Sequence, residues 1–114
     1  MISTHVLDTA LGRPAAGMPV VLERAEAGEG ASTGVLARAA TDADGRVREL
    51  LPAGAVLAAG TYRLTFETGA YFEALGTDGF YPRVAILFTV RDPTQHHHVP
   101  LLLSPFGYAT YRGS

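Results

Sequence analysis

The chain has 114 residues, 9 of them basic and 11 acidic, which gives a formal net charge of -2, and 47% of its residues are hydrophobic. This length is typical of one domain, so we expect a single domain over residues 1–114. The slight negative charge and the absence of a basic tract argue against nucleic acid as a partner. No stretch approaches the roughly 20 apolar residues of a membrane span, which argues against a membrane protein.

The sequence contains no cysteine, which excludes disulfides, thiolate zinc sites and cysteine nucleophiles. The residues after Met1 are polar and strand-like, whereas a secretory leader has a charged segment followed by an apolar one. We therefore expect a cytoplasmic protein.

Short apolar or alternating segments, separated by glycines and prolines along the whole chain, predict an all-β protein. In chain order, the predicted strands cover residues 2–8, 18–24, 34–40, 61–67, 84–90, 97–104 and 108–112. This number of strands in one small domain is typical of a sandwich.

Two of these segments indicate how their strands are buried. In residues 61–67, Tyr62, Leu64 and Phe66 alternate with polar residues, which predicts a strand with one buried face. Residues 84–90 are apolar on both faces, so we expect a central strand or a strand that lines an interface.

The segments between the strands contain turn signals. Asp and Gly within residues 8–14 and 42–45 predict tight reversals of the backbone. We interpret residues 53–60 as a loop or an edge strand, and the small, acidic residues 25–32 as an exposed loop.

One short helix is expected. It covers residues 70–75, where alanine and leucine favour a helix. Thr68 is predicted to be its N-cap, and Gly76 is predicted to end it.

The four histidines lie in or next to predicted strands. His5 shares a face of its strand with Ser3, whereas alternation puts His96 and His98 on one face of another strand and His97 on the other. On spacing alone, the favoured interpretation is a partly exposed or hydrogen-bonded histidine. Because adjacent strand residues point to opposite faces, His97 and His98 do not suit one metal ion, and we expect no metal site.

Two further segments carry polar groups of interest. Arg46 follows the turn at residues 42–45, and spacing alone favours a solvated arginine there. The last residues keep aromatic and strand-forming side chains, so we expect them to be held in place. Tyr111 offers a phenol, Arg112 a planar cation and Ser114 a hydroxyl, and each of these groups can orient a histidine or bind a planar polar ligand.

Five segments, taken in order, resemble the transthyretin-like family. They are STHVLD with GRP at residues 3–14, TDADGR at 41–46, FYP at 80–82, HVPLLLSP at 98–105 and YRGS at 111–114. The last of them is similar to the signature tail of the family's enzymatic branch, the 5-hydroxyisourate hydrolases. Any one segment is a weak signal, but five in the same order make the resemblance specific.

The resemblance implies an enzyme of urate degradation that opens the ring of 5-hydroxyisourate to 2-oxo-4-hydroxy-4-carboxy-5-ureidoimidazoline, without a cofactor. It also implies a transthyretin-like sandwich of two four-stranded sheets with one short helix. The assembly it implies is a homotetramer, a dimer of dimers with sites where subunits meet. One alternative is a non-catalytic carrier of a small aromatic ligand, although the hormone-carrying transthyretins lack the histidines and the tail. The other is a structural β-sandwich, which composition alone favours.

The resemblance assigns catalytic roles to His5, Arg46 and His98, and substrate binding to Tyr111, Arg112, Gly113 and Ser114. We expect His98 or His5 to take a proton from the attacking water, while the other holds the water or protonates the leaving nitrogen. Arg46 is expected to stabilise negative charge, and Arg112 to pair with a carboxylate.

One residue departs from the family pattern. His97 stands where an aromatic residue, often tyrosine, is common in the family. By alternation His97 points away from His98, so we expect a change in packing and none in catalysis.

Overall fold

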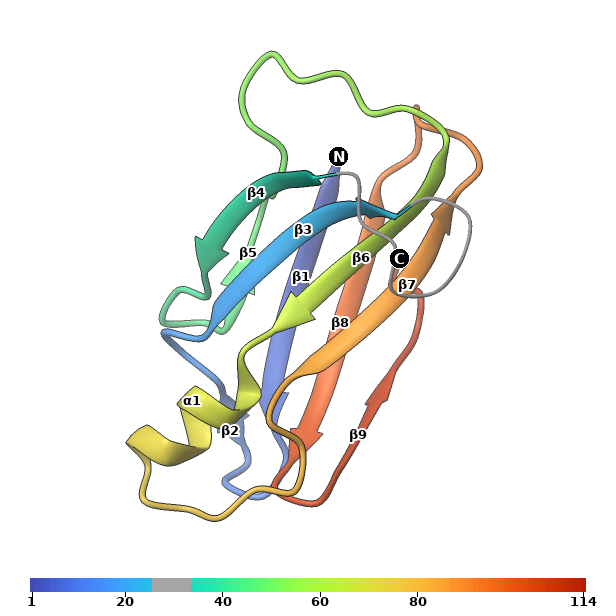
Figure 1. The fold of residues 1–114 in the computed structure, drawn as a ribbon. Helices are drawn as coiled ribbons and strands as arrows, with labels where there is room; N and C mark the ends of the chain where they lie inside the picture. Colours follow the sequence, from blue (N-terminus) through green and yellow to red (C-terminus); the bar gives the residue numbers. More distant parts are fainter. Residues whose placement is uncertain (26–33) are drawn as a thin grey trace.

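Strands account for most of the computed structural model, which describes residues 1–25 and 34–114. The elements are β1 (Ile2–Asp8), β2 (Arg13–Pro14), β3 (Pro19–Ala25), β4 (Gly34–Ala40), β5 (Arg46–Val47), β6 (Gly60–Phe66), α1 (Thr68–Ala74), β7 (Val84–Val90), β8 (His97–Ser104) and β9 (Gly107–Thr110) (Figure 1). The predicted strands are confirmed, with some ends shifted by one or two residues, and β2 and β5 are additional. The exposed loop predicted for residues 25–32 lies outside the described residues, apart from Ala25 at the end of β3.

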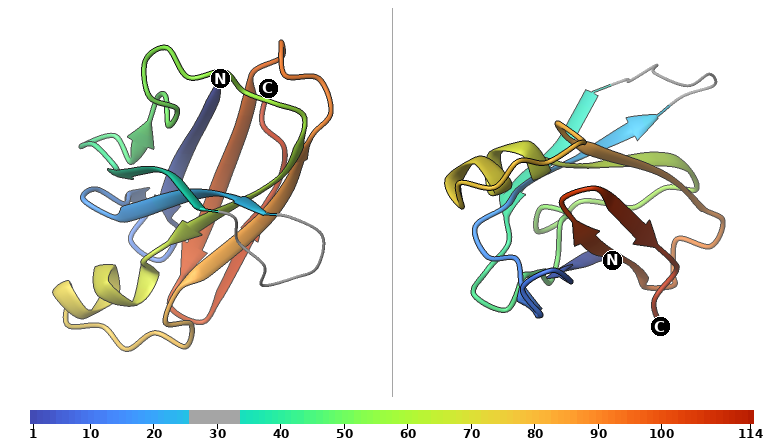
Figure 2. Two further views of the ribbon diagram at one scale, coloured as in Figure 1. Left: turned by 45° about the horizontal axis from the view of Figure 1, so that its top comes forward. Right: turned by 90° about the horizontal axis from the view of Figure 1, so that it is seen from below.

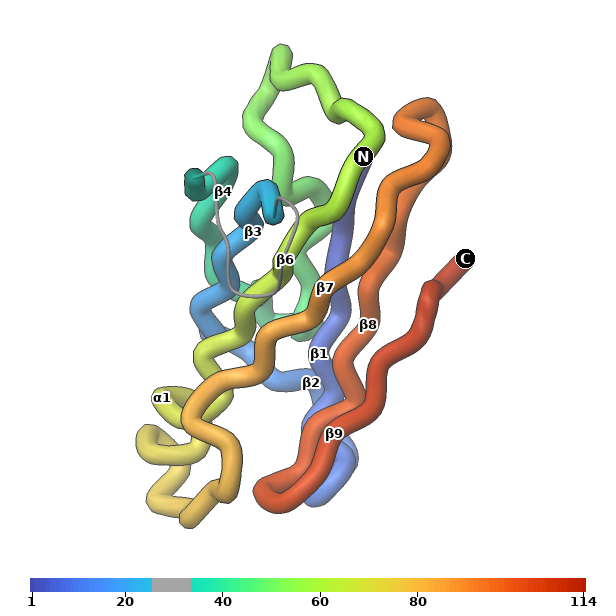
Figure 3. The backbone as a smooth tube through the Cα atoms, turned by 45° about the vertical axis from the view of Figure 1, so that its right-hand side comes forward, coloured from blue at the N-terminus to red at the C-terminus, as the bar shows by residue number. Residues whose placement is uncertain are grey.

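The strands form two sheets. The first, the β3–β6 sheet, has the order β4-β3-β6-β7 and is antiparallel throughout. The second, the β1–β8 sheet, has the order β2-β1-β8-β9, and β5 also pairs with β1. β8 pairs in parallel with the whole of β1. The opposite edge of β1 is therefore left for β2 and β5, which both pair with it (Figure 3). This sheet is therefore at most four strands wide at any level, in agreement with the predicted sandwich.

The core lies between the two sheets, which Figure 2 shows as layers. Tyr62, Leu64 and Phe66 of β6 are buried and the residues between them are half-buried, which confirms the predicted alternation. Val6 and Leu101 are fully buried on the facing sheet. Burial of one such side chain contributes roughly 1.5–3 kcal/mol, so this layer is the main stabilising feature of the sandwich.

β7 is an edge strand of the β3–β6 sheet, so the prediction of a central strand is wrong. Val84, Ile86 and Val90 face the core, whereas Leu87 on the other face remains 43% exposed. Within the described part of the chain no element covers this second face. The other interpretation, a strand that lines an interface, stays a prediction.

The helix begins two residues earlier than predicted and ends one residue earlier. Glu67 occupies the N-cap position without a side-chain cap hydrogen bond, so the predicted N-cap role of Thr68 is wrong. The Thr68 hydroxyl instead donates to the backbone carbonyl of Tyr81, at 3.3 Å. Gly76 follows the C-cap with a φ of 68°, which confirms its predicted place at the helix end.

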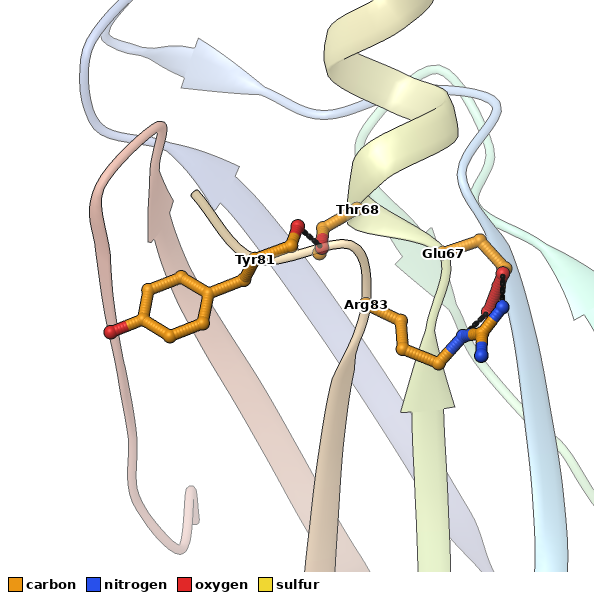
Figure 4. Close-up of polar contacts among 4 residues, drawn as sticks. All are labelled: Glu67, Thr68, Tyr81 and Arg83. Atoms are coloured by element: carbon orange, nitrogen blue, oxygen red, sulfur yellow. Dashed lines mark hydrogen bonds and ion pairs between the residues drawn. The ribbon is translucent and has the colours of Figure 1, made fainter. Parts of the chain in front are cut away.

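The segment that leads into β7 is bonded to the start of α1 (Figure 4). The Gly69 N–H donates to the carbonyl of Pro82 at 3.0 Å, which satisfies one of the unpaired donors of the first helical turn. Arg83 forms an ion pair with Glu67, with Nε 3.2 Å from Oε2. These contacts hold the helix at the end of the sandwich away from the N-terminus (Figure 1).

The predicted turns are also present. Oδ1 of Asp8 accepts hydrogen bonds from the N–H groups of Ala10 and Leu11 at 3.0 Å each, which confirms the reversal within residues 8–14. Residues 53–59 form a loop, and Gly60 already belongs to β6, so the loop alternative is confirmed. In the described part of the chain, no helix has the length and apolar character needed to cross a membrane.

Candidate functional site

A pocket of about 170 Å³, here called the site pocket, lies on the face of the β1–β8 sheet that is turned away from the core. Its lining comes from β1, β5, β8 and the C-terminal residues 111–114, here called the tail. The lining residues are Ser3, Thr4, Arg46, Val47, Arg48, His96, His98 and Ser114. Segments from both ends of the sequence and from its middle therefore meet at one cavity.

Strand pairing determines which residues of β1 are neighbours of β5 and β8. Ser3 lies opposite His98 in the parallel pairing of β1 with β8. Two residues further along, His5 lies opposite Pro100 on one side and Arg46 on the other. Because paired residues share a face of a sheet, His5 and Arg46 lie side by side near the pocket that contains His98.

A serine hydroxyl joins two of the histidines. Ser3 Oγ lies 2.7 Å from Nδ1 of His98 and 2.7 Å from Nε2 of His96. Ser3 is only 5% exposed, whereas His98 is half-buried and His96 is exposed. The three groups thus form a continuous hydrogen-bonded chain from the surface to the pocket.

The turn before β5 positions Arg46. Oδ1 of Asp42 accepts the backbone N–H groups of Asp44 and Arg46, both at 2.9 Å. The bond from the Arg46 N–H is the main cause of the lowered pKa of Asp42, so this carboxylate stays ionised. Gly45 has a φ of 73°, and a Cβ there would collide with the carbonyl oxygen of Val6, so the turn requires glycine.

The tail is fastened to β8 at His98. The Gly113 N–H donates to the carbonyl of His98 at 2.9 Å. A Cβ on Gly113 would collide with Cδ2 of the His98 ring, so only glycine lets the tail backbone lie this close to the imidazole. Gly113 is thereby placed against the ring, and Ser114 reaches the pocket lining.

The other two tail residues lie elsewhere in the single chain. Tyr111 and Arg112 line a second cavity of about 280 Å³, together with residues of β7 and β8 that include His98. Tyr111 is 58% exposed. Arg112 donates from Nη2 to the side-chain oxygen of Gln95 at 3.1 Å, so the expected pairing with a carboxylate is wrong.

The surroundings of His98 favour its neutral form. Burial is the main factor that lowers its pKa below the usual 6.5, and the positive charges of His96, Arg46 and His5 lower it further. A neutral imidazole at neutral pH can accept a proton. Because Nδ1 is bonded to Ser3, Nε2 is the ring nitrogen left for that role.

Of the predicted site residues, the structure brings Arg46, His98 and Ser114 into one pocket, with His5 and Gly113 directly beside them. Sequence reasoning missed Ser3 and His96. Alternation had placed each of them on the same face as a candidate histidine, which was the available signal. Among the described residues no group of three or more His, Asp or Glu side chains is arranged to hold a metal ion.

The arrangement suits hydrolysis of a carbonyl compound. A neutral imidazole can take the proton of an attacking water, and a guanidinium can stabilise the oxyanion that forms. A seryl hydroxyl can hold either the water or the substrate. The pocket is polar, and its volume of about 170 Å³ suits a compact heterocycle.

Comparison with known proteins gives consistent matches over the whole chain. The sequence profile of the HIUase/Transthyretin family matches residues 2–113. A 5-hydroxyisourate hydrolase of Caulobacter vibrioides is 50% identical, over 99% of this chain and 97% of that protein. The structure of Klebsiella pneumoniae 5-hydroxyisourate hydrolase superposes with a TM-score of 0.84 at 42% identity, covering 99% and 92% of the two chains. Sea bream transthyretin in complex with thyroxine superposes with a TM-score of 0.87 at 30% identity, covering 98% and 93%.

Proposed function

Because the chain belongs to the HIUase/Transthyretin family, we propose that it hydrolyses 5-hydroxyisourate to 2-oxo-4-hydroxy-4-carboxy-5-ureidoimidazoline in urate degradation. The observation that carries this proposal is the convergence of Arg46, His98 and Ser114 on one pocket. Identities of 42–50% to proteins named 5-hydroxyisourate hydrolase support it. The reaction uses groups of the chain alone, without a cofactor.

In the first step, water attacks a ring carbonyl and Nε2 of His98 takes its proton. The lowered pKa of His98 supports this role, because a base must be unprotonated at the working pH. General-base assistance of this kind is worth about 10² to 10⁴ in rate. His98 is favoured over His5 because it lines the site pocket and its ring is hydrogen-bonded.

In the second step, the tetrahedral oxyanion collapses, the C–N bond of the ring breaks and the leaving nitrogen takes up a proton. Arg46 stabilises the oxyanion, and its backbone is held by Asp42 for this purpose. His5, in register with Arg46, passes to the leaving nitrogen the proton that His98 took from the water, so both imidazoles end neutral as they began. Ser114 holds the attacking water or the substrate in the site pocket, and Gly113 keeps the tail against the His98 ring. Tyr111 and Arg112 bind the substrate from the second cavity, which His98 also lines.

A carrier of a small aromatic ligand is the alternative with less support. The sea bream transthyretin that contains thyroxine is 30% identical to this chain, compared with 50% for the Caulobacter hydrolase. Binding of a small aromatic ligand does not require a hydrogen-bonded imidazole beside a guanidinium in a polar pocket. The hydrolase therefore accounts for more of the site.

The proposal includes assembly as a homotetramer, a dimer of dimers, in the cytoplasm. In the described part of the chain, β7 and β9 are edge strands, and uncovered edges favour pairing with another chain. Phe80 is 69% exposed and Tyr108 is 43% exposed, which supplies apolar surface next to these edges. Native mass spectrometry at micromolar concentration should give four times the chain mass of 12.0 kDa.

The activity is tested with 5-hydroxyisourate freshly made by urate oxidase. The substrate also decays spontaneously, so the measured quantity is the loss of its ultraviolet absorbance above that background. The purified chain should accelerate this loss, with a constant rate above pH 6.5 and a decline at lower pH, because the pKa of His98 lies below 6.5. Decay at the background rate at every protein concentration would exclude the hydrolase and leave the carrier and the structural β-sandwich.

A further inference from the structure

We propose that Ser3 is a positioning residue of this site, whose hydroxyl holds His98 in the tautomer that leaves Nε2 free and links that ring to His96. The inference rests on the proposed function for the tautomer of His98 and its role in catalysis, but not for the hydrogen-bonded chain itself. The observation behind it is the pair of 2.7 Å contacts that Ser3 Oγ makes, one to each ring.

The number of protons on Ser3 limits the possible arrangements. A hydroxyl donates one hydrogen bond and accepts others, so Ser3 donates to one ring and accepts from the other. If His98 donates from Nδ1, Ser3 donates to Nε2 of His96, and both neutral rings carry their proton on Nδ1. In the reverse arrangement both rings carry it on Nε2. If both rings donated to Ser3, the proton of this buried hydroxyl would be left unpaired, which is costly.

The proposed role of His98 as a base requires the first arrangement. Arg46 on β5 and His5 on β1 both act on His98 and disfavour a second positive charge there. Arg48, from the segment after β5, also lines the pocket. A base at this place must therefore be neutral with Nε2 unprotonated, which requires the proton on Nδ1 and its bond to Ser3.

No other hydroxyl of β1 can replace Ser3. Thr4 is the next residue, but its hydroxyl donates to the carbonyl of Val99 at 2.6 Å, a contact on the buried side of the pairing with β8. Thr9, beyond the end of β1, bonds to the carbonyl of Leu103, far along β8. Within β1, the hydroxyl that bonds to the His98 ring belongs to the residue directly opposite it in the parallel pairing.

The first test uses the wild-type protein and does not depend on activity. Nitrogen-15 NMR of the histidine rings at pH 8 should place the proton on Nδ1 in both His98 and His96. In Ser3→Ala the His98 ring should relax to the exchanging mixture of tautomers of an unconstrained imidazole. A proton on Nε2 in either wild-type ring would overturn the proposal.

The second test is kinetic. Ser3→Ala should lower kcat by about 10-fold to 10²-fold with a smaller change in KM, because a misoriented base is costly in the transition state. Ser3→Thr keeps a hydroxyl and should restore most of the rate. Ser104→Ala is the matched control, because it removes a serine hydroxyl that bonds to Gly107 at the far end of β8, and it should behave as wild type.

The link to His96 is tested by a double-mutant cycle. His96→Gln is an exposed substitution that should fold, and it should raise the pH midpoint of the activity because a positive neighbour of His98 is removed. If Ser3 orients His98, the losses of Ser3→Ala and His96→Gln in kcat should be less than additive. A wild-type kcat in folded Ser3→Ala would overturn the role of Ser3, and full additivity would overturn its link to His96. An inactive wild type would overturn the proposed function instead, and the NMR test would still decide the hydrogen-bonded chain.

Discussion

His97 and His98 are adjacent in β8 and lie in opposite environments. His97 points between the sheets and is 4% exposed, and its Nδ1 has no hydrogen-bond partner among the described residues. His98 points to the site pocket, and its Nδ1 is bonded to Ser3. Both pKa values are lowered, in both cases mainly by burial. The second cause is Arg112 for His97 and His96 for His98.

The comparison shows that a lowered pKa does not by itself identify a catalytic histidine. Burial lowers the pKa of any imidazole, whatever its role. What distinguishes His98 is the set of groups around its ring: a hydroxyl on Nδ1, a guanidinium in the same pocket and the tail backbone against one edge. His97 also has a guanidinium nearby, because it lines the second cavity with Arg112. Its Nδ1, however, has no hydrogen-bond partner among the described residues, and the Gly113 backbone lies against the ring of His98. We therefore expect His97 to act in packing.

Among substitutions that distinguish the two faces of β8, His98→Asn is expected to have the largest effect on kcat. Asparagine keeps a polar group but cannot act as a base at neutral pH, so kcat should fall by at least about 10². His97→Phe is the matched control, because it replaces a ring of similar size on the other face, and its kcat should stay near that of wild type. Steady-state assay of both variants, with native mass as a check of assembly, measures the difference. Equal losses in the two variants would remove the distinction between the faces.

A smaller effect is expected where the tail touches His98. In Gly113→Ala the new methyl group meets Cδ2 of the imidazole, so either the ring or the tail must move. A displacement on this scale should lower kcat by roughly 10-fold to 10²-fold, with little change in the unfolding midpoint. Gly107→Ala in β9 is the control, because its Cβ meets only the Ser104 hydroxyl at an ordinary 3.7 Å. Full activity in Gly113→Ala would show that the contact does not position His98.

The fold was predictable because its strands are set by local patterns. Alternation in β6 and the apolar run of β7 each mark a strand without reference to the rest of the chain. The sequence of a strand does not show in the same way which strands lie beside it in the sheet. β7 was compatible with a central position because its outer face is apolar, but it is an edge strand. The start of α1 also depended on a distant segment, since Thr68 bonds to Tyr81 and does not cap the helix.

The candidate site was predictable in part, for the same reason. The resemblance to a family placed Arg46, His98 and Ser114, and the structure brings these three to one pocket. Ser3 and His96 were missed because their contact requires the register of a parallel pairing between residues more than 90 positions apart. Alternation assigns a residue to a face of its strand, but the partner across the sheet follows from tertiary structure.

The smallest effect is expected from His97→Phe, on stability. The substitution removes a buried nitrogen, Nδ1, that has no hydrogen-bond partner among the described residues, and such a group costs about 1–3 kcal/mol. Part of this gain is lost because phenylalanine is slightly larger than histidine in a close-packed core. We therefore expect the free energy of unfolding at pH 7 to rise by about 1 kcal/mol, measured by urea titration.

The same variant should change how stability depends on pH. The pKa of His97 in the folded chain lies below the 6.5 of the unfolded chain, so below pH 6.5 the unfolded chain binds a proton first. The contribution of neutral His97 to the free energy of unfolding is therefore fully present above pH 6.5, and it is lost as the pH falls from 6.5 through the lowered pKa. His97→Phe has no such group, so its stability should fall less than that of wild type between pH 7 and pH 5. If stability falls equally with pH in the two proteins, protonation of His97 costs no free energy of unfolding. His97 and His98 would then differ only in the face of β8 on which they lie.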